Sequence, residues 1–194
     1  MIRTFFIAAA IALLGGSLSA QITQSCFPGT NGVIACPCAQ PTNPNGGCAN
    51  FGAGSTTGAI LNASGTPSVS ADTVVLTVSN ERILTNGLLN VFYTVKPGSL
   101  GPGTQHGAGV RCTVGGVTKR LYTVPVYGGT GSMPGVGDPS VSVRTATGTL
   151  ASPIIPPETR YYFNLYRDPQ APGPCGMTQA TVNLSNTVSI LWSL

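Results

Sequence analysis

Residues Leu88–Val95 read LLNVFYTV, a run of apolar, aromatic and β-branched residues broken by a single asparagine. Side chains of these types suit a pleated, half-buried surface, and a run of this length is typical of a strand. A similar run, Asp72–Val78 (DTVVLTV), comes before it. Between the two runs lies Asn86-Gly87, the favoured dipeptide of a tight hairpin turn. We therefore predict two strands joined as an antiparallel hairpin.

Further strand signals lie on both sides of this pair. They are Ala59–Ala63, Val110–Val114, Val117–Val124, Ser140–Ala146, Arg160–Arg167 and Thr181–Leu191. In Ser140–Ala146, Val and Thr alternate with Ser and Arg, which is the period of a half-buried strand. Gly115-Gly116 predicts a second two-residue hairpin. About eight short strands without a convincing helix indicate an all-β fold, a single antiparallel β-sandwich that is Ig-like or jelly-roll-like.

The first twenty residues have the features of a secretory signal peptide. Arg3 is followed by an apolar run from Phe5 to Leu14 and by small residues that end at Ala20. This run is too short to span a bilayer, and small residues suit cleavage after Ala20. We predict residues 1–20 as signal peptide, 21–55 as a cysteine-rich irregular segment, and 56–194 as the β-sandwich, with 21–55 packed on it in one domain. The expected location is secreted, either extracellular or at the cell surface, with no membrane span in the mature chain.

All six cysteines follow this leader: Cys26, Cys36, Cys38, Cys48, Cys112 and Cys175. An even number of cysteines in an exported chain indicates disulfides. Cys112 and Cys175 lie outside the N-terminal cluster, so we predict that they bond to each other. Cys36 and Cys38 are expected to have different partners, and Cys26–Cys36 with Cys38–Cys48 is preferred over the crossed alternative. The one-residue gap in Cys-Pro-Cys fits zinc poorly, and we expect no metal or cofactor.

Charge and composition argue against several classes of function. Only 7% of the residues are charged, and the net charge of +4 comes from scattered cations, whereas nucleic-acid binding requires a concentrated basic face. His106 is the single histidine, and no serine lies in a G-x-S-x-G motif. The acids Asp72, Glu81, Asp138, Glu158 and Asp168 are each isolated in sequence, which argues against a catalytic pair or a calcium site. Asp72 and Asp138 begin candidate strands and Asp168 precedes a proline, positions where aspartate commonly caps a turn. We therefore predict that the protein is not an enzyme.

Aromatic residues suggest an alternative function. Exposed aromatic faces on a sheet can bind glycans, and the candidates are Tyr93, Tyr122, Tyr127, Tyr161, Tyr162, Tyr166 and Trp192. Such residues more often fill the core or pair across strands. Glycan binding would require two or three of these rings to lie exposed in a row on one sheet.

Six motifs in order resemble a family of secreted bacterial domains that is frequent in planctomycetes. They are CPCAQPTNPNGGCAN, ASGTPSVSADTVVLT, GVRCTVGGVTKRLY, PGVGDPSVSVR, TRYYFNLYRDP and NLSNTVSILW, and the resemblance covers Cys26 to Trp192. Relatives often carry Gly-Asp-Gly near the first cysteine, where this chain has Pro28-Gly29-Thr30-Asn31-Gly32. The resemblance implies a β-rich extracellular domain and supplies no catalytic residues.

These observations together favour a secreted or cell-surface, non-catalytic module with a structural or assembly role. A low charge leaves little electrostatic repulsion between copies and permits self-association. The alternative is a glycan-binding module that uses exposed strand aromatics. The expected partners are further copies of the chain or envelope glycans, and not nucleic acid.

Overall fold

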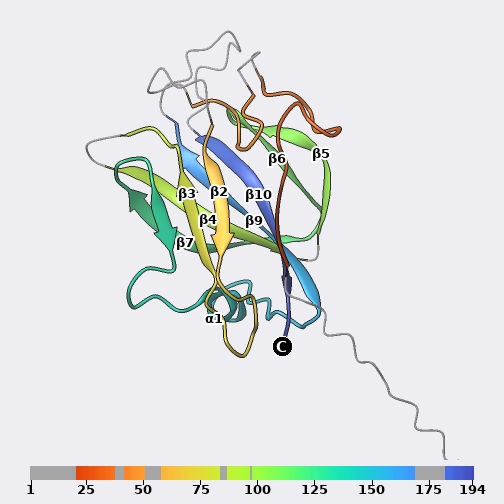
Figure 1. The fold of residues 1–194 in the computed structure, drawn as a ribbon, viewed down its shortest axis with the longest axis vertical. Coiled ribbons are helices and arrows are strands. Elements are labelled where there is room, and N and C mark those ends of the chain that lie inside the picture. Colours follow the sequence, from red (N-terminus) through yellow and green to blue (C-terminus); the bar gives the residue numbers. More distant parts are fainter. Residues whose placement is uncertain (1–20, 38–41, 51–57, 84–86, 97, 169–181) are drawn as a thin grey trace, which may run out of the picture.

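The computed structural model describes residues 21–37, 42–50, 58–83, 87–96, 98–168 and 182–194 (Figure 1). Within these ranges the chain forms ten strands and one short helix. The elements are β1 Gln21–Ser25, β2 Ile60–Ser64, β3 Val75–Ser79, β4 Leu88–Lys96, β5 Ser99–His106, β6 Gly109–Val114, β7 Val117–Val126, β8 Gly131–Met133, α1 Val141–Ala146, β9 Glu158–Arg167 and β10 Val182–Trp192. The prediction of an all-β fold is confirmed.

The strands form three antiparallel sheets. The largest has five strands in the order β1-β10-β9-β4-β7, the second has the order β2-β3-β8, and the third is the pair β5-β6. In the large sheet, Tyr162 on β9 lies opposite Val188 on β10 and Thr94 on β4. The architecture is a sandwich whose large sheet carries the three-stranded sheet on one face and the two-stranded sheet against the other (Figure 1).

The main core lies between the five-stranded and three-stranded sheets. Alternate residues of β9 and β10, among them Tyr162 and Trp192, meet Leu61 and Leu76 of the small sheet, and all four are fully buried. The indole nitrogen of Trp192 donates a hydrogen bond to the hydroxyl of Tyr162 at 3.0 Å, so neither polar atom is left unsatisfied by burial. Burial raises the pKa of this tyrosine.

The opposite face of the large sheet has a smaller core. Val95, Phe163 and Leu184 are buried there, and Tyr93 stacks on Phe163 with ring centroids 5.2 Å apart. The guanidinium of Arg111 on β6 lies 5.5 Å from the same Phe163 ring. The two-stranded sheet therefore packs on this face through an aromatic and cationic contact as well as aliphatic ones.

A bulge interrupts the pairing of β9 with β10 between Leu184 and Thr187. At this point the backbone N–H of Asn164 donates to the side-chain oxygen of Ser185 at 3.0 Å, in place of a main-chain acceptor. The Ser185 hydroxyl donates in turn to the carbonyl of Asn186 at 2.7 Å. The sequence Leu-Ser-Asn-Thr thus supplies side-chain partners where the regular hydrogen-bond ladder is lost.

The predicted strand Ser140–Ala146 is wrong, because Val141–Ala146 is helix α1. Val141 and Thr145 are buried together on one side of the helix, whereas Val143 is half exposed. The Thr145 hydroxyl donates to the Val141 carbonyl at 2.7 Å, and a carboxylate oxygen of Asp72 accepts the Ser142 N–H at 2.7 Å. Tertiary capping by a distant aspartate stabilises a helix that the local alternation does not predict.

Both predicted hairpins are also wrong. β3 pairs with β2 and β8, whereas β4 pairs with β7 and β9, so the turn at Gly87 connects different sheets. β6 pairs with β5 and β7 pairs with β4, so Gly115 and Gly116 also lead from one sheet to another. Both of these glycines have positive φ, at 66° and 70°. The turn residues mark a sharp reversal, but burial of each strand's apolar face decides which strand it pairs with.

Three strands lie where no strand was predicted. β1 falls in the segment expected to be irregular and pairs with β10. β5 contains two glycines and a proline, and β8 lies in the Gly/Pro-rich region after β7. The seven other strands coincide with the predicted ones to within a few residues.

Candidate functional site

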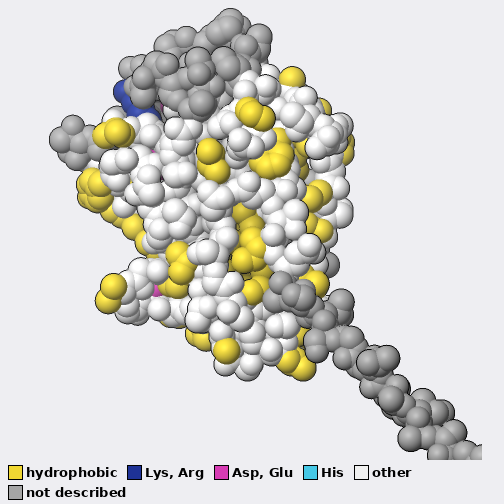
Figure 2. All heavy atoms as spheres, viewed as in Figure 1, with side chains coloured by type: hydrophobic (Ala, Val, Ile, Leu, Met, Phe, Trp, Pro, Cys, Tyr) yellow, Lys and Arg dark blue, Asp and Glu magenta, His cyan; other side chains and the backbone are white. Residues whose placement is uncertain are grey.

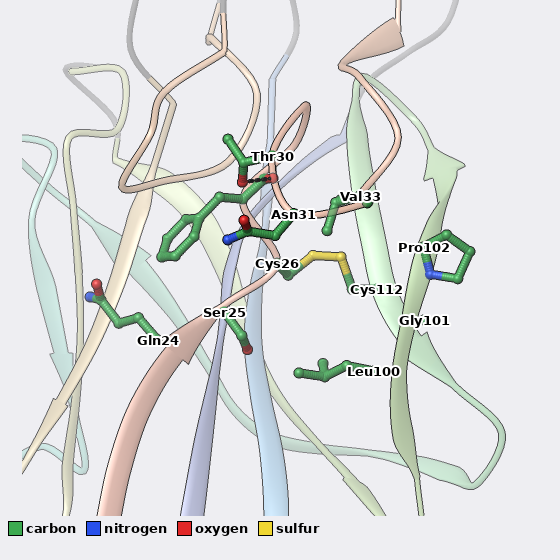
Figure 3. Close-up of a pocket in the computed structure, with 12 residues that line it drawn as sticks. Gln24, Ser25, Cys26, Thr30, Asn31, Val33, Leu100, Gly101, Pro102 and Cys112 are labelled. Carbon is green, nitrogen blue, oxygen red and sulfur yellow. Dashed lines mark hydrogen bonds between the residues drawn. A yellow bond between two sulfur atoms is a disulfide. The ribbon is translucent and has the colours of Figure 1, made fainter.

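A cavity of about 530 Å³ lies beside the disulfide between Cys26 and Cys112 (Figure 3). One wall is the segment after β1, and the other is β5 around Leu100 and Pro102. The Cys26–Cys112 bond links the segment after β1 to β6, the strand that pairs with β5 (Figure 3). The lining residues are Gln24, Ser25, Cys26, Phe27, Thr30, Asn31, Gly32, Val33, Leu100, Gly101, Pro102 and Cys112. We call this feature the disulfide groove.

The disulfide groove is lined by neutral residues. Amide and hydroxyl groups come from Gln24, Ser25 and Asn31, and apolar surface comes from Val33 and Leu100. The amide of Gln24 donates to the carbonyl of Leu61 at 3.2 Å, and the Ser25 hydroxyl donates to the carbonyl of Thr187 at 3.3 Å. Mixed apolar and amide surface suits an uncharged polar chain, since it offers both contact area and hydrogen bonds.

The observed disulfides correct the predicted pairing. Cys112 bonds to Cys26 and not to Cys175, and Cys36 bonds to Cys48, which overturns Cys26–Cys36 and Cys38–Cys48. Cys38 and Cys175 lie outside the described residues. The reason for the error is topological. Position in the sequence separated Cys112 from the N-terminal cluster, whereas β6 packs beside β10 and so brings Cys112 next to the end of β1.

His106 is the last residue of β5 and is exposed to solvent. It lines a small cavity of about 130 Å³ together with Tyr93, Arg111, Thr118, Phe163 and Leu165. These neighbours include no acid that could orient an imidazole as a general base and no serine or cysteine nucleophile.

Three of the five acidic side chains accept hydrogen bonds from main-chain N–H groups. Asp72 accepts hydrogen bonds from the N–H groups of Val74 and Ser142, and Asp138 accepts one from Gly135 at 3.0 Å. The expectation that these two aspartates cap turns is confirmed, although Asp138 precedes a helix and not a strand. Glu158 accepts from the N–H of Ile155 at 2.9 Å and pairs with Lys96 and Arg160.

Glu81 and Asp168, the other two acids, are buried near Tyr166. Asn90 donates to Glu81 Oε2 at 2.8 Å, yet burial outweighs this bond and raises the Glu81 pKa from 4.5 to about 8. Asn183 donates to Asp168 Oδ2 at 3.3 Å. Burial raises the pKa of Tyr166, and the negative charges of Asp168 and Glu81 raise it further. We call these five residues the buried polar cluster.

The buried polar cluster was not predicted from the sequence, although the sequence contains a pattern that could have indicated it. Asn90, Tyr166 and Asn183 are register neighbours on β4, β9 and β10. Both asparagines lie inside apolar strand runs, where asparagine is disfavoured. A polar residue in such a run indicates either a solvent-facing position or a buried hydrogen-bond partner, and here both side chains are fully buried.

The predicted aromatic residues do not form an exposed row. Tyr122, Tyr162, Tyr166 and Trp192 are buried, and Tyr93 and Tyr161 are half-buried. Tyr127 is exposed over 60% of its surface and lies beside Gly87 and Pro125. Most of these rings therefore pack in one of the two hydrophobic cores.

In the described ranges, no three His, Cys, Asp or Glu side chains group closely enough to hold a metal ion. None of the helical residues described forms a helix with the length and hydrophobicity needed to cross a membrane. Comparison with protein-family models, with curated proteins and with solved structures finds no match to this chain.

Proposed function

We propose that the protein is a secreted or cell-surface, non-catalytic β-sandwich module with a structural or assembly role. The observation that carries this proposal is that three of the acidic side chains bind main-chain N–H groups of the fold itself. Asp72 accepts the N–H of Ser142 in the first turn of α1, and Asp138 and Glu158 accept backbone N–H groups of loops, so their charge stabilises the fold. Two disulfides fit an oxidising environment and anchor the N-terminal segment.

The surface supports an assembly role. Figure 2 shows hydrophobic side chains distributed over the visible face among mostly uncharged atoms. Ile83 and Tyr127 are exposed over more than half of their surface, and Leu89 over 46%. Leu89 lies opposite Pro125 on β7, and Tyr127 lies beside the same proline. Leu89, Pro125 and Tyr127 therefore form one apolar corner. A weakly charged surface with such a corner permits contact between copies.

Sedimentation velocity tests this proposal directly. The mature protein is run from low micromolar to near-millimolar concentration, and binding to isolated cell envelopes is measured in parallel. We expect a concentration-dependent rise in sedimentation coefficient or retention on envelopes. Tyr127→Ser should weaken self-association, and Tyr161→Ser, which changes a half-buried tyrosine elsewhere, is the matched control. A strict monomer that does not bind envelopes would contradict the proposal.

Binding of a neutral glycan is a second candidate function, favoured by the disulfide groove. Its uncharged walls and its volume of about 530 Å³ suit a short stretch of a polysaccharide chain. Asn31 has a φ of 48°, so Asn31→Gly removes the amide and keeps the backbone conformation accessible. Gln105→Ala, an exposed amide outside the groove, is the control. Loss of binding to neutral polysaccharides in both variants alike would argue against the groove as the site.

A further inference from the structure

A second cavity, of about 340 Å³, lies between β7 and the loop after helix α1. It is lined by Lys119, Arg120, Arg144 and residues 147–150. Three of the nine lysine and arginine residues of the chain thus meet at one place in a protein with only 7% charged residues. We call this feature the basic pocket.

The positive charge of the basic pocket is not neutralised by neighbouring acids. No aspartate or glutamate is among its lining residues. The ion pairs within the described ranges join Glu158 to Lys96 and Arg160, and they leave Lys119, Arg120 and Arg144 without a carboxylate partner. The cations lie close enough to affect one another, since burial and the charges of Arg144 and Arg160 lower the pKa of Lys119. A site of this kind attracts anions.

Two of the three cations are held in place by main-chain carbonyls. Lys119 Nζ donates to the carbonyl oxygens of Thr145 and Thr147, at the end of α1. Arg144 Nε donates to the carbonyl of Leu121 at 2.7 Å, with its guanidinium 5.8 Å from the ring centre of Tyr122. These bonds account for the positions of Lys119 and Arg144, and they leave the terminal nitrogens of Arg144 for a ligand. Because these side chains are already ordered, little conformational entropy would be lost when a ligand binds.

Arg120 has no such structural role. It is exposed, and its side chain makes no hydrogen bond or ion pair within the described part of the chain. The neighbouring loop adds the hydroxyl of Thr149 to the same cavity, whereas the Thr147 hydroxyl already donates to the carbonyl of Val143 at 3.0 Å. A hydroxyl beside two guanidinium groups matches the acceptor oxygens of a tetrahedral anion.

We propose that the basic pocket binds a sulfate or phosphate group. The group would be carried as an ester on an extracellular polymer, or would be the free ion. This site is separate from the disulfide groove and does not depend on self-association.

The test is a nuclear magnetic resonance titration of the intact mature protein. Sodium sulfate and sodium phosphate are added in separate arms at constant ionic strength, and dextran sulfate is compared with uncharged dextran. We expect saturable shifts in the amide signals of Thr147–Leu150. Arg120→Gln should weaken binding about fivefold, the loss expected for one partly exposed charge contact. Arg167→Gln, which removes an exposed arginine outside the pocket, should leave the affinity unchanged.

The outcomes separate the two sources of the anion. Tighter binding of dextran sulfate than of free sulfate, with dextran inactive, supports an ester on a polymer. Saturation by the free ions without that gain supports a free-ion site. Absence of saturable shifts at Thr147–Leu150 overturns the proposal. Equal losses in Arg120→Gln and Arg167→Gln would also overturn it, because they would indicate a general charge effect.

Discussion

The side chain of Asn186 pairs with the main chain of Leu61 in the way a neighbouring strand would. The N–H of Leu61 donates to Asn186 Oδ1 at 2.7 Å, and Asn186 Nδ2 donates to the carbonyl of Leu61 at 3.0 Å. Both residues are fully buried. The bulge in β10 thus projects an amide that joins the two layers of the sandwich through hydrogen bonds inside the core.

Asn186→Ala should therefore be strongly destabilising. It removes both hydrogen bonds and leaves the Leu61 N–H without its acceptor, at a cost of about 2–4 kcal/mol. Urea unfolding measures the change, and Asn45→Ala, at an exposed asparagine, is the control. A loss no larger than in this control would contradict the structural role of Asn186.

The two disulfides should contribute unequally to stability. Cys26–Cys112 closes a separation of 86 residues and Cys36–Cys48 one of 12. The loop-entropy relation gives about 4–5 kcal/mol for the longer loop and about 3 kcal/mol for the shorter. We expect the Cys26→Ser/Cys112→Ser protein to unfold at lower denaturant than the Cys36→Ser/Cys48→Ser protein.

Non-reducing peptide mapping checks the pairing itself. Fragments that contain Cys26 and Cys112 should remain linked until reduction, and so should those that contain Cys36 and Cys48. A fragment linking Cys112 to Cys175 would refute the observed pairing.

Glu81 should make stability depend on pH. Its pKa is about 8 in the folded protein against 4.5 for an ordinary glutamate, so the folded state retains a proton that the unfolded chain releases. The stabilisation that protonated Glu81 gives the folded state is fully present below pH 4.5 and is lost as the pH rises through 8. Between these values the free energy of unfolding falls by about 1.4 kcal/mol per pH unit. Urea unfolding across this range should show a flatter profile for Glu81→Gln, and Glu158→Gln should keep the slope. An unchanged slope in Glu81→Gln would exclude Glu81 as its source.

His106→Ala should leave the fold and any biological activity unchanged. The side chain is exposed at the end of β5, and surface changes of this kind usually alter stability by less than about 0.5 kcal/mol. Thermal unfolding gives the first measurement. A hydrolytic activity that disappears in this variant at an unaltered melting temperature would contradict a non-catalytic role.

The strands could be predicted where local pattern and tertiary burial agree. Runs such as Leu88–Val95 and Arg160–Arg167 are apolar enough to be buried in any β protein, and they lie in β4 and β9. Strand β5 was not predicted, because its glycines and proline weaken the strand signal. It becomes a strand through its pairing with β6, which depends on the tertiary fold. Helix α1 depends on Asp72, which is distant in sequence, and therefore has no local signature.

The candidate sites were less predictable than the fold. The disulfide groove requires knowledge that β6 lies beside the end of β1, which no spacing of cysteines reveals. In the basic pocket, Lys119-Arg120 is visible as an adjacent pair, but Arg144 joins it through α1, in a segment that was expected to be a strand. Sequence patterns report the burial of each segment and not which distant segments meet.

The pairing of Gln21 with Leu191 has a consequence for how the module is displayed. The chain enters and leaves the sandwich at one pole, whereas β1 runs from that pole to Cys26 and the disulfide groove. A tether joined to either terminus would therefore hold the molecule by this pole. The groove begins at Gln24 and lies towards the Cys26 end of β1, so it would be displaced from the point of attachment.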